Sequence, residues 1–175
     1  TSRGGTYECA DILLRHGVQA NPRSLLDGST PLVFAAFRGD VDTAKLLIQY
    51  GADVNAVKTE TGSSPLVCAA QGDHAELVEM LLACGADPRI TKKDGTAPLA
   101  HAVGNGYARV AKALLDAGAD LFLSPAGFSG AKKLPAISAA AEAGHTGVVR
   151  ALLDAGADAN ALNPFNGNGF TPLAH

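Results

Sequence analysis

The 175-residue sequence predicts an all-α fold, an α-solenoid of stacked helix-turn-helix repeats with projecting β-hairpin turns. Two phrases recur in a fixed register along the chain: a leucine-rich run that ends in glycine, and Thr or Ser followed by Pro, Leu and small apolar residues. Composition is the third observation, because the chain is 47% hydrophobic but only 5% aromatic, with no Trp. Ala and aliphatic side chains must therefore supply the core, as in closely stacked short helices.

The repeat length follows from the glycine that ends each leucine-rich run. This residue falls at Gly17, Gly51, Gly85, Gly118 and Gly156, so the spacings are 34, 34, 33 and 38 residues. A period of about 33 residues with one five-residue insertion explains them. We expect one repeat domain over 1–175, with four full repeats and a partial unit at each end: 1–29, 30–63, 64–96, 97–134, 135–170 and 171–175.

The first helix of each repeat has a start and a stop signal. Thr30-Pro31 and Ser64-Pro65 are typical helix starts, because the hydroxyl accepts a free backbone N–H and proline fits the first turn. Twelve positions before each repeat glycine stands a residue suited to a left-handed turn. The residues predicted to end the helix in this way are Gly5, Gly39, Asp73, Gly106 and Gly144.

The second helix carries apolar residues at helical spacing, for example Val41, Ala44, Leu47 and Ile48. The repeat glycine then caps it. The aspartate that follows is expected to bond backbone N–H groups of its own turn, which accounts for much of the acidic content. These aspartates are Asp53, Asp87, Asp120 and Asp158.

Charge and cysteine content exclude several classes of protein. A net charge of -3 and a pI near 5.9 disfavour a nucleic-acid partner. No apolar run reaches the roughly 20 residues of a membrane span. Three cysteines without a metal-ligand spacing predict reduced thiols in a cytoplasmic or nuclear protein, with Cys68 and Cys84 as small core residues. The first residue is Thr, so a longer parent chain or larger assembly is expected.

No catalytic, cofactor or metal motif is present in the sequence. Gly127-Phe128-Ser129-Gly130 lacks the second glycine of a nucleophile elbow, and neither HExxH nor a dinucleotide-binding glycine motif occurs. Carboxylates spaced at one per repeat do not form an acid/base pair. We therefore predict a protein that is not an enzyme and needs no cofactor.

The phrases TPLVFAA, GDVDTAKLLIQYGADVNA and GHTGVVRALLDAGADANA resemble the ankyrin repeat, and the resemblance extends over nearly the whole chain. The family's second-position histidine is replaced by Val33, Val67, Ala100 and Ser138. His74 and His145 match the histidine after the inter-helix turn and are expected to make turn hydrogen bonds. His101 stands where the pattern has a buried aliphatic residue, as a satisfied core histidine or a weak point.

The resemblance implies a non-catalytic scaffold that binds a protein or peptide through a concave groove of hairpin tips and first helices. The alternative is a regulatory or docking arm of a larger enzyme, channel or multi-subunit complex. A third possibility is hydroxylation of Asn55 and Asn160, which resemble asparagines that ankyrin repeats offer to a hydroxylase; a turn-stabilising role is the competing explanation.

Two sets of residues are candidates for partner binding. The first lies just before the inter-helix turn, where Phe37 and Arg38 have the composition of an interface anchor, and contains also Gln71, Asn105 and Glu142. Packing between repeats is the competing role for Phe37. The second set lies at the hairpin tips, the enlarged one at 124–133 included: Leu25, Leu26, Thr59, Glu60, Lys92, Lys93, Phe128, Lys132, Lys133, Phe165 and Asn166. The two lysine pairs either form a basic strip that favours an acidic peptide or are solvated charges.

Overall fold

The computed structural model describes residues 3–123 and 134–161. The chain divides into two compact units, Thr1–Asp87 and Pro88–His175. In the described parts of both units, short helices are paired in helix-turn-helix repeats, with little sheet. The predicted all-α repeat architecture is therefore confirmed.

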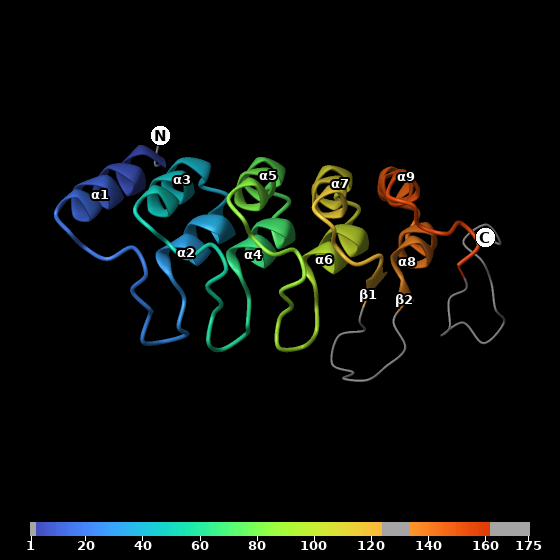
Figure 1. Cartoon of the computed structure of the whole chain (residues 1–175), viewed down its shortest axis with the longest axis horizontal. Helices are drawn as coiled ribbons and strands as arrows, with labels where there is room; N and C mark the ends of the chain where they lie inside the picture. Colours follow the sequence, from blue (N-terminus) through green and yellow to red (C-terminus); the bar gives the residue numbers. More distant parts are fainter. Residues whose placement is uncertain (1–2, 124–133, 162–175) are drawn as a thin grey trace. The chain divides into compact units, whose positions relative to one another are not determined.

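The first unit holds five helices in the part of it that the structure describes. They are α1 (Arg3–Arg15), α2 (Pro31–Arg38), α3 (Val41–Gln49), α4 (Pro65–Gln71) and α5 (Ala75–Ala83). Helices α1, α3 and α5 lie in one layer and α2 and α4 in a second, and the connecting segments project beyond this second layer (Figure 1). Residues at the ends of α2 and α4 therefore lie in the layer beyond which the tips project.

The second unit has the same paired helices, with a short two-stranded sheet in the connection between α7 and α8. Its elements are α6 (Pro98–Asn105), α7 (Ala108–Asp116), β1 (Phe122–Leu123), β2 (Leu134–Pro135), α8 (Ala136–Glu142) and α9 (Thr146–Asp154). The strands pair antiparallel, with Phe122 opposite Pro135. Among the described residues, this is the only predicted hairpin that contains β-strands. The connections after α1, α3 and α5 are turns, closed by hydrogen bonds such as Lys58 N–H to Ser63 O (3.0 Å).

Helix starts and stops follow the local signals in the sequence. Thr30 and Ser64 accept the N–H groups of Val33 and Val67, as predicted. The predicted left-handed turns are confirmed at Gly39, Asp73, Gly106 and Gly144, with φ between 55° and 78°. The prediction for Gly5 is wrong, since it lies inside α1. No described helix precedes Gly5 to fold back against, so the backbone there stays helical.

The core consists of leucine, valine and alanine side chains from both layers. The fully buried leucines are Leu32, Leu66, Leu77 and Leu81 in the first unit and Leu99, Leu114 and Leu152 in the second. Cys68 is buried as predicted, but Cys84 is exposed, so its assignment to the core is wrong. Cys84 follows the last residue of α5 and lies against Met80, with 3.8 Å between the sulfur atoms.

Helix α1 exposes an apolar face that the equivalent helix α3, in the same layer, keeps buried. Leu13 and Leu47 both stand four residues before a repeat glycine, yet Leu13 is 53% exposed and Leu47 only 3%. Helix α2 packs on α3, which carries Leu47, whereas no described helix takes that place against α1. Among the described helices, none has both the length and the apolar content to cross a bilayer.

Candidate functional site

Phe37 and Arg38 form the C-terminal end of α2, and both are exposed. Phe37 is 66% exposed, so it is not buried between repeats. Phe34 is 53% exposed and lies three residues earlier, which places the two rings on one face of the helix. We call Phe34, Phe37 and Arg38 the aromatic patch. Sequence reasoning missed Phe34, although the i, i+3 spacing was visible.

The end of α2 is held in place by a histidine of the next repeat. His74, which precedes α5, donates from Nε2 to the carbonyl of Phe37 at 3.3 Å. Its ring also packs over the turn after α2, because a Cβ built on Gly39 would lie 2.5 Å from the His74 Nδ1. In the second unit His145 bonds Gly104 O at 3.3 Å. The predicted turn hydrogen bonds are confirmed at both histidines.

The other residues predicted before the turns are also at the surface. Gln71, Asn105 and Glu142 end α4, α6 and α8, and all three are exposed. In the first unit α2 packs on α4, so the aromatic patch and Gln71 lie on neighbouring helices (Figure 1). In the second unit α6 packs on α8, which carries Glu142. The structure thus brings each unit's candidates onto one layer.

The two tips of the first unit are tied to each other. The Lys58 ammonium lies 2.8 Å from the Asp27 carboxylate, and Arg23 donates to the carbonyl of Val57 at 2.9 Å. Lys58 and Ser29 hydrogen-bond the Asp27 carboxylate and hold its pKa well below the ordinary range. These contacts position the exposed tip residues, which are Leu25, Leu26, Thr59 and Glu60.

At the 88–97 tip of the second unit, Lys92 and Lys93 differ in their surroundings. Lys93 is exposed, but the Lys92 ammonium lies 3.3 Å from the Asp94 carboxylate. Sequence reasoning overlooked Asp94, although it stands two residues away. The remaining candidates, Phe128, Lys132, Lys133, Phe165 and Asn166, lie outside the described residues.

Two asparagines connect neighbouring turns of the first unit. Asn21 donates from Nδ2 to Gly51 O at 2.9 Å and accepts the Asp53 N–H at 2.8 Å. Asn55 donates to Gly85 O at 3.2 Å and accepts the Asp87 N–H at 2.9 Å. We call this pair of bonds the asparagine clamp. Sequence reasoning assigned Asn55 to its own turn and missed the bridge, whose signal is an asparagine recurring every 34 residues.

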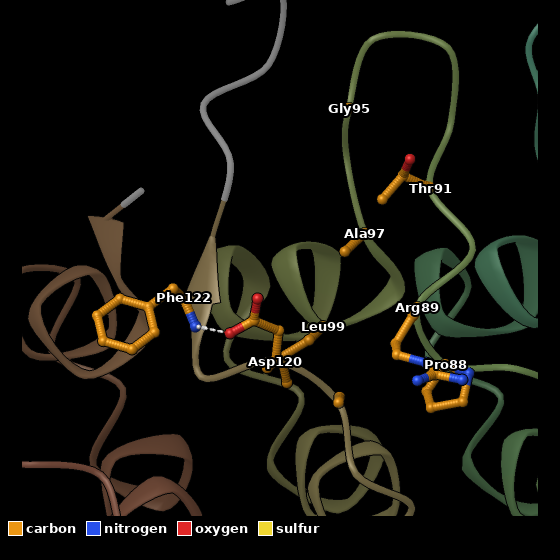
Figure 2. A pocket seen from close by; sticks show the side chains of 9 residues that line it. Pro88, Arg89, Thr91, Gly95, Ala97, Leu99, Asp120 and Phe122 are labelled. Atoms are coloured by element: carbon orange, nitrogen blue, oxygen red, sulfur yellow. Dashed lines mark hydrogen bonds between the residues drawn. The ribbon is translucent and has the colours of Figure 1, made fainter. Parts of the chain in front are cut away.

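The second unit contains a cavity of about 240 Å³ between two successive turns (Figure 2). Its lining is mostly apolar. Its lining residues are Pro88, Arg89, Thr91, Gly95, Ala97, Leu99, Ala119, Asp120 and Phe122. Within the described residues, no group of three or more His, Cys, Asp or Glu side chains is placed to hold a metal ion.

His101 is a weak point of the second unit. Its Nε2 is buried and has no hydrogen-bond partner among the described residues. Burial lowers the pKa of the imidazole, the Lys92 charge lowers it further, and Asp94 opposes both. The prediction of a satisfied core histidine is therefore wrong, because a polar ring occupies an aliphatic position without a partner for this nitrogen.

We expect acid to destabilise the protein through His101. Below about pH 6.5 the unfolded chain binds a proton at this residue that the folded chain does not, so the free energy of unfolding falls until the lowered pKa is passed. His101→Leu should remove this contribution and raise stability at pH 7.5 by about 1 kcal/mol. Urea denaturation at pH 7.5 and 5.5 measures both effects. An equal loss on acidification in wild type and variant would contradict the expectation.

Comparison with protein families gives two matches. A model of ankyrin repeats in three copies matches residues 1–58 and 56–125. A model of the single ankyrin repeat matches residues 134–164. The comparison with curated proteins found no match. The family matches together span most of the 175 residues and agree with the helix pairs of both units.

Proposed function

Because the chain belongs to the ankyrin repeat family, whose members generally act in protein–protein interaction, we propose that it is a non-catalytic scaffold that binds a protein or peptide. The partner lies along the layer of first helices and the projecting tips. The observation that carries this proposal is the aromatic patch, where two exposed phenylalanines stand beside an exposed arginine. Aromatic residues and arginine supply most of the anchors at protein interfaces.

The surroundings of the patch support a preformed site. His74 fixes the carbonyl of Phe37 and packs over the turn after α2, so the end of the helix is held in position before binding. A fixed surface loses less conformational entropy on association. Gln71 on the neighbouring helix α4 offers an exposed amide to the same partner.

The turn aspartates support the non-catalytic part of the proposal. Asp53, Asp120 and Asp158 each accept a backbone N–H from the residue two positions later, at 2.8–3.0 Å. Their role as turn caps accounts for these carboxylates without invoking chemistry. Turnover of any substrate by the purified chain would contradict this part.

Phe37→Ala/Arg38→Ala tests the placement of the binding site. Loss of an interface anchor typically costs 2 kcal/mol or more, so we expect recovery of the partner to fall by at least about tenfold. Pull-downs with the purified chain, quantified by mass spectrometry, provide the measurement. The matched control is Lys45→Ala/Tyr50→Ala, which removes an exposed cation and an exposed aromatic from α3 and its C-terminal end.

Equal recovery by the patch variant and the control, with both proteins folded by circular dichroism, would refute the placement. The same pull-down distinguishes the scaffold function from the alternative, in which the chain is a docking arm of a larger enzyme, channel or complex. The exposed Ile12 and Leu13 of α1 favour that alternative. If Ile12→Ser/Leu13→Ser loses the partner and the patch variant keeps it, the docking surface is α1.

We also propose Asn55 and Asn160 as hydroxylation sites. The Asn55 amide is engaged in the clamp at both its polar atoms, so a hydroxylase would act on a chain whose turns have separated. Asn160 stands at the corresponding point of a later repeat, and its N–H donates to Asp158. Mass spectrometry that finds only unmodified peptides from cells would exclude this proposal.

A further inference from the structure

The first tip of the chain carries two leucines that lie fully in solvent. Leu25 and Leu26 are 103% and 96% exposed, more than any other large apolar side chain in the described residues. The next tip has Thr59 and Glu60 at these positions, 34 residues later, and both are exposed as well. The repeat fold therefore does not require apolar residues here, and exposed apolar groups of this kind mark contact sites. We call Leu25 and Leu26 the leucine tip.

Hydrogen bonds hold the backbone of the leucine tip in place. The Ser24 N–H donates to Ser29 O and the Gly28 N–H donates to Ser24 O, both at 2.9 Å. The Arg23 guanidinium donates to Gly28 O at 3.3 Å and to Val57 O of the neighbouring tip at 2.9 Å. Because the turn is fixed before any contact forms, inserting its side chains costs little conformational entropy.

The cavity of the second unit has a size and a lining that suit a leucine side chain. It holds about 240 Å³, and its lining includes the buried Leu99 and Ala119 and the ring of Phe122, which is 49% exposed (Figure 2). An apolar cavity of about 150 Å³ holds benzene, so this cavity accommodates one leucine side chain. The chain thus carries both an exposed apolar tip and an apolar cavity that can receive it.

We infer that two copies of the chain associate, with the leucine tip of one copy inserted into the cavity of the other. One leucine fills the cavity, and the second packs against the exposed ring of Phe122. An apolar group that meets a complementary pocket elsewhere on an identical molecule produces such a head-to-tail contact. Because the contact joins two copies, it requires no particular placement of the two units within one chain. It goes beyond the proposed function and does not use the aromatic patch.

Several charges near both surfaces are engaged within the chain, which favours an uncharged contact. Beside the leucine tip, the Lys58 ammonium lies 2.8 Å from the Asp27 carboxylate. At the cavity, Arg89 and Asp120 both interact with other residues of the chain. The Asp120 carboxylate also accepts the Phe122 N–H at 3.0 Å. An aliphatic side chain can therefore fill the cavity without leaving these charges buried and unpaired.

The small size of the contact predicts a weak association. Two leucines and their surroundings bury far less than the roughly 1,600 Å² of a stable interface, so the contact belongs with the transient ones. Each buried leucine should strengthen the association by at least about tenfold. With two leucines we expect a dissociation constant of roughly 0.1–1 mM. Sedimentation equilibrium of the wild-type chain at increasing concentration measures it.

Mixing two complementary variants isolates the contact. Leu25→Ser/Leu26→Ser, the tip variant, keeps the cavity. Thr91→Trp, the cavity variant, keeps the leucine tip but places an indole in the cavity, which Thr91 lines. When the unlabelled cavity variant is added to the ¹⁵N-labelled tip variant, amide chemical shifts should change at Leu99 and Phe122. With the labels exchanged, they should change at Leu25 and Leu26.

Matched controls show whether the effect belongs to these side chains. Thr59→Ser/Glu60→Ser alters the equivalent exposed pair of the next tip, and Thr6→Trp adds an indole at an exposed threonine of α1. Both control variants should associate like the wild-type chain in sedimentation equilibrium. The tip variant alone and the cavity variant alone should each associate at least about tenfold more weakly. Circular dichroism verifies that all four variants are folded.

Shifts at the cavity that appear with the cavity variant, and vanish when the added chain also lacks the leucine tip, would support the inference. A wild-type chain that stays monomeric at about 1 mM would overturn it. So would equal association by the tip variant and its control, or shifts at the cavity that persist without any leucine tip. The outcome is separable from the proposed function, because partner capture through the aromatic patch is measured with Phe37→Ala/Arg38→Ala, which leaves tip and cavity intact.

Discussion

Replacing Leu47 by alanine is expected to lower the free energy of unfolding by about 2–5 kcal/mol. Leu47 is 3% exposed and lies on α3, on which α2 packs. Truncating it removes buried apolar surface and leaves a cavity that the flanking helices cannot fill without moving. Urea denaturation followed by far-ultraviolet circular dichroism measures the loss, provided that the slope of the transition stays unchanged.

Leu13→Ala is the matched control for Leu47→Ala. Leu13 stands at the same position of its repeat but is 53% exposed. Its truncation should therefore cost less than about 1 kcal/mol, since surface substitutions have small effects. A loss as large as that of Leu47→Ala would mean that the apolar face of α1 is covered in solution, contrary to the structure described above.

Gly39→Ala is expected to cost about 2–3 kcal/mol for two reasons. Gly39 has φ of 69°, and an L-residue pays about 1–2 kcal/mol in this left-handed conformation. The added Cβ would also lie 2.5 Å from the His74 Nδ1, so the ring must move and its bond to Phe37 O is put at risk. That bond adds roughly 1 kcal/mol to the loss. Thermal and urea denaturation provide the measurement.

Gly51→Ala separates the two causes. Gly51 has φ of 82°, but nothing lies within 4 Å of an added Cβ. Only the backbone cost of about 1–2 kcal/mol should then appear. Equal losses at Gly39 and Gly51 would show that the His74 contact contributes nothing, and His74 would no longer explain the fixed end of α2.

Features set by local signals were predictable from the sequence. Thr30 and Ser64 cap their helices because the hydroxyl and the free N–H belong to residues three positions apart. Asp73 adopts the left-handed turn, with φ of 55°, because aspartate is one of the few residues with a Cβ that tolerate this conformation. Gly5 stands at the same repeat position but lies inside α1, because the left-handed turn also needs a preceding helix.

Two features that depend on a neighbouring repeat were not predicted. The asparagine clamp joins Asn55 to Asp87, 32 residues away, so no local pattern reveals it. The burial of His101 without a partner for Nε2 depends in the same way on the surrounding packing. In the candidate site, the exposure of Phe37 was predicted correctly, but the ion pair that neutralises Lys92 was overlooked.

Because of the asparagine clamps, the hydrogen-exchange rates of two backbone amides report contact between neighbouring repeats. The N–H groups of Asp53 and Asp87 lie in turns, outside any helix, and each donates to an asparagine of the preceding repeat. Exchange at such a position requires the donor to leave its acceptor. Their protection from exchange therefore reports how often two adjacent turns separate. The protection of helix amides reports instead how often a repeat itself unfolds. Exchange at each clamp thus measures the coupling between two neighbouring repeats.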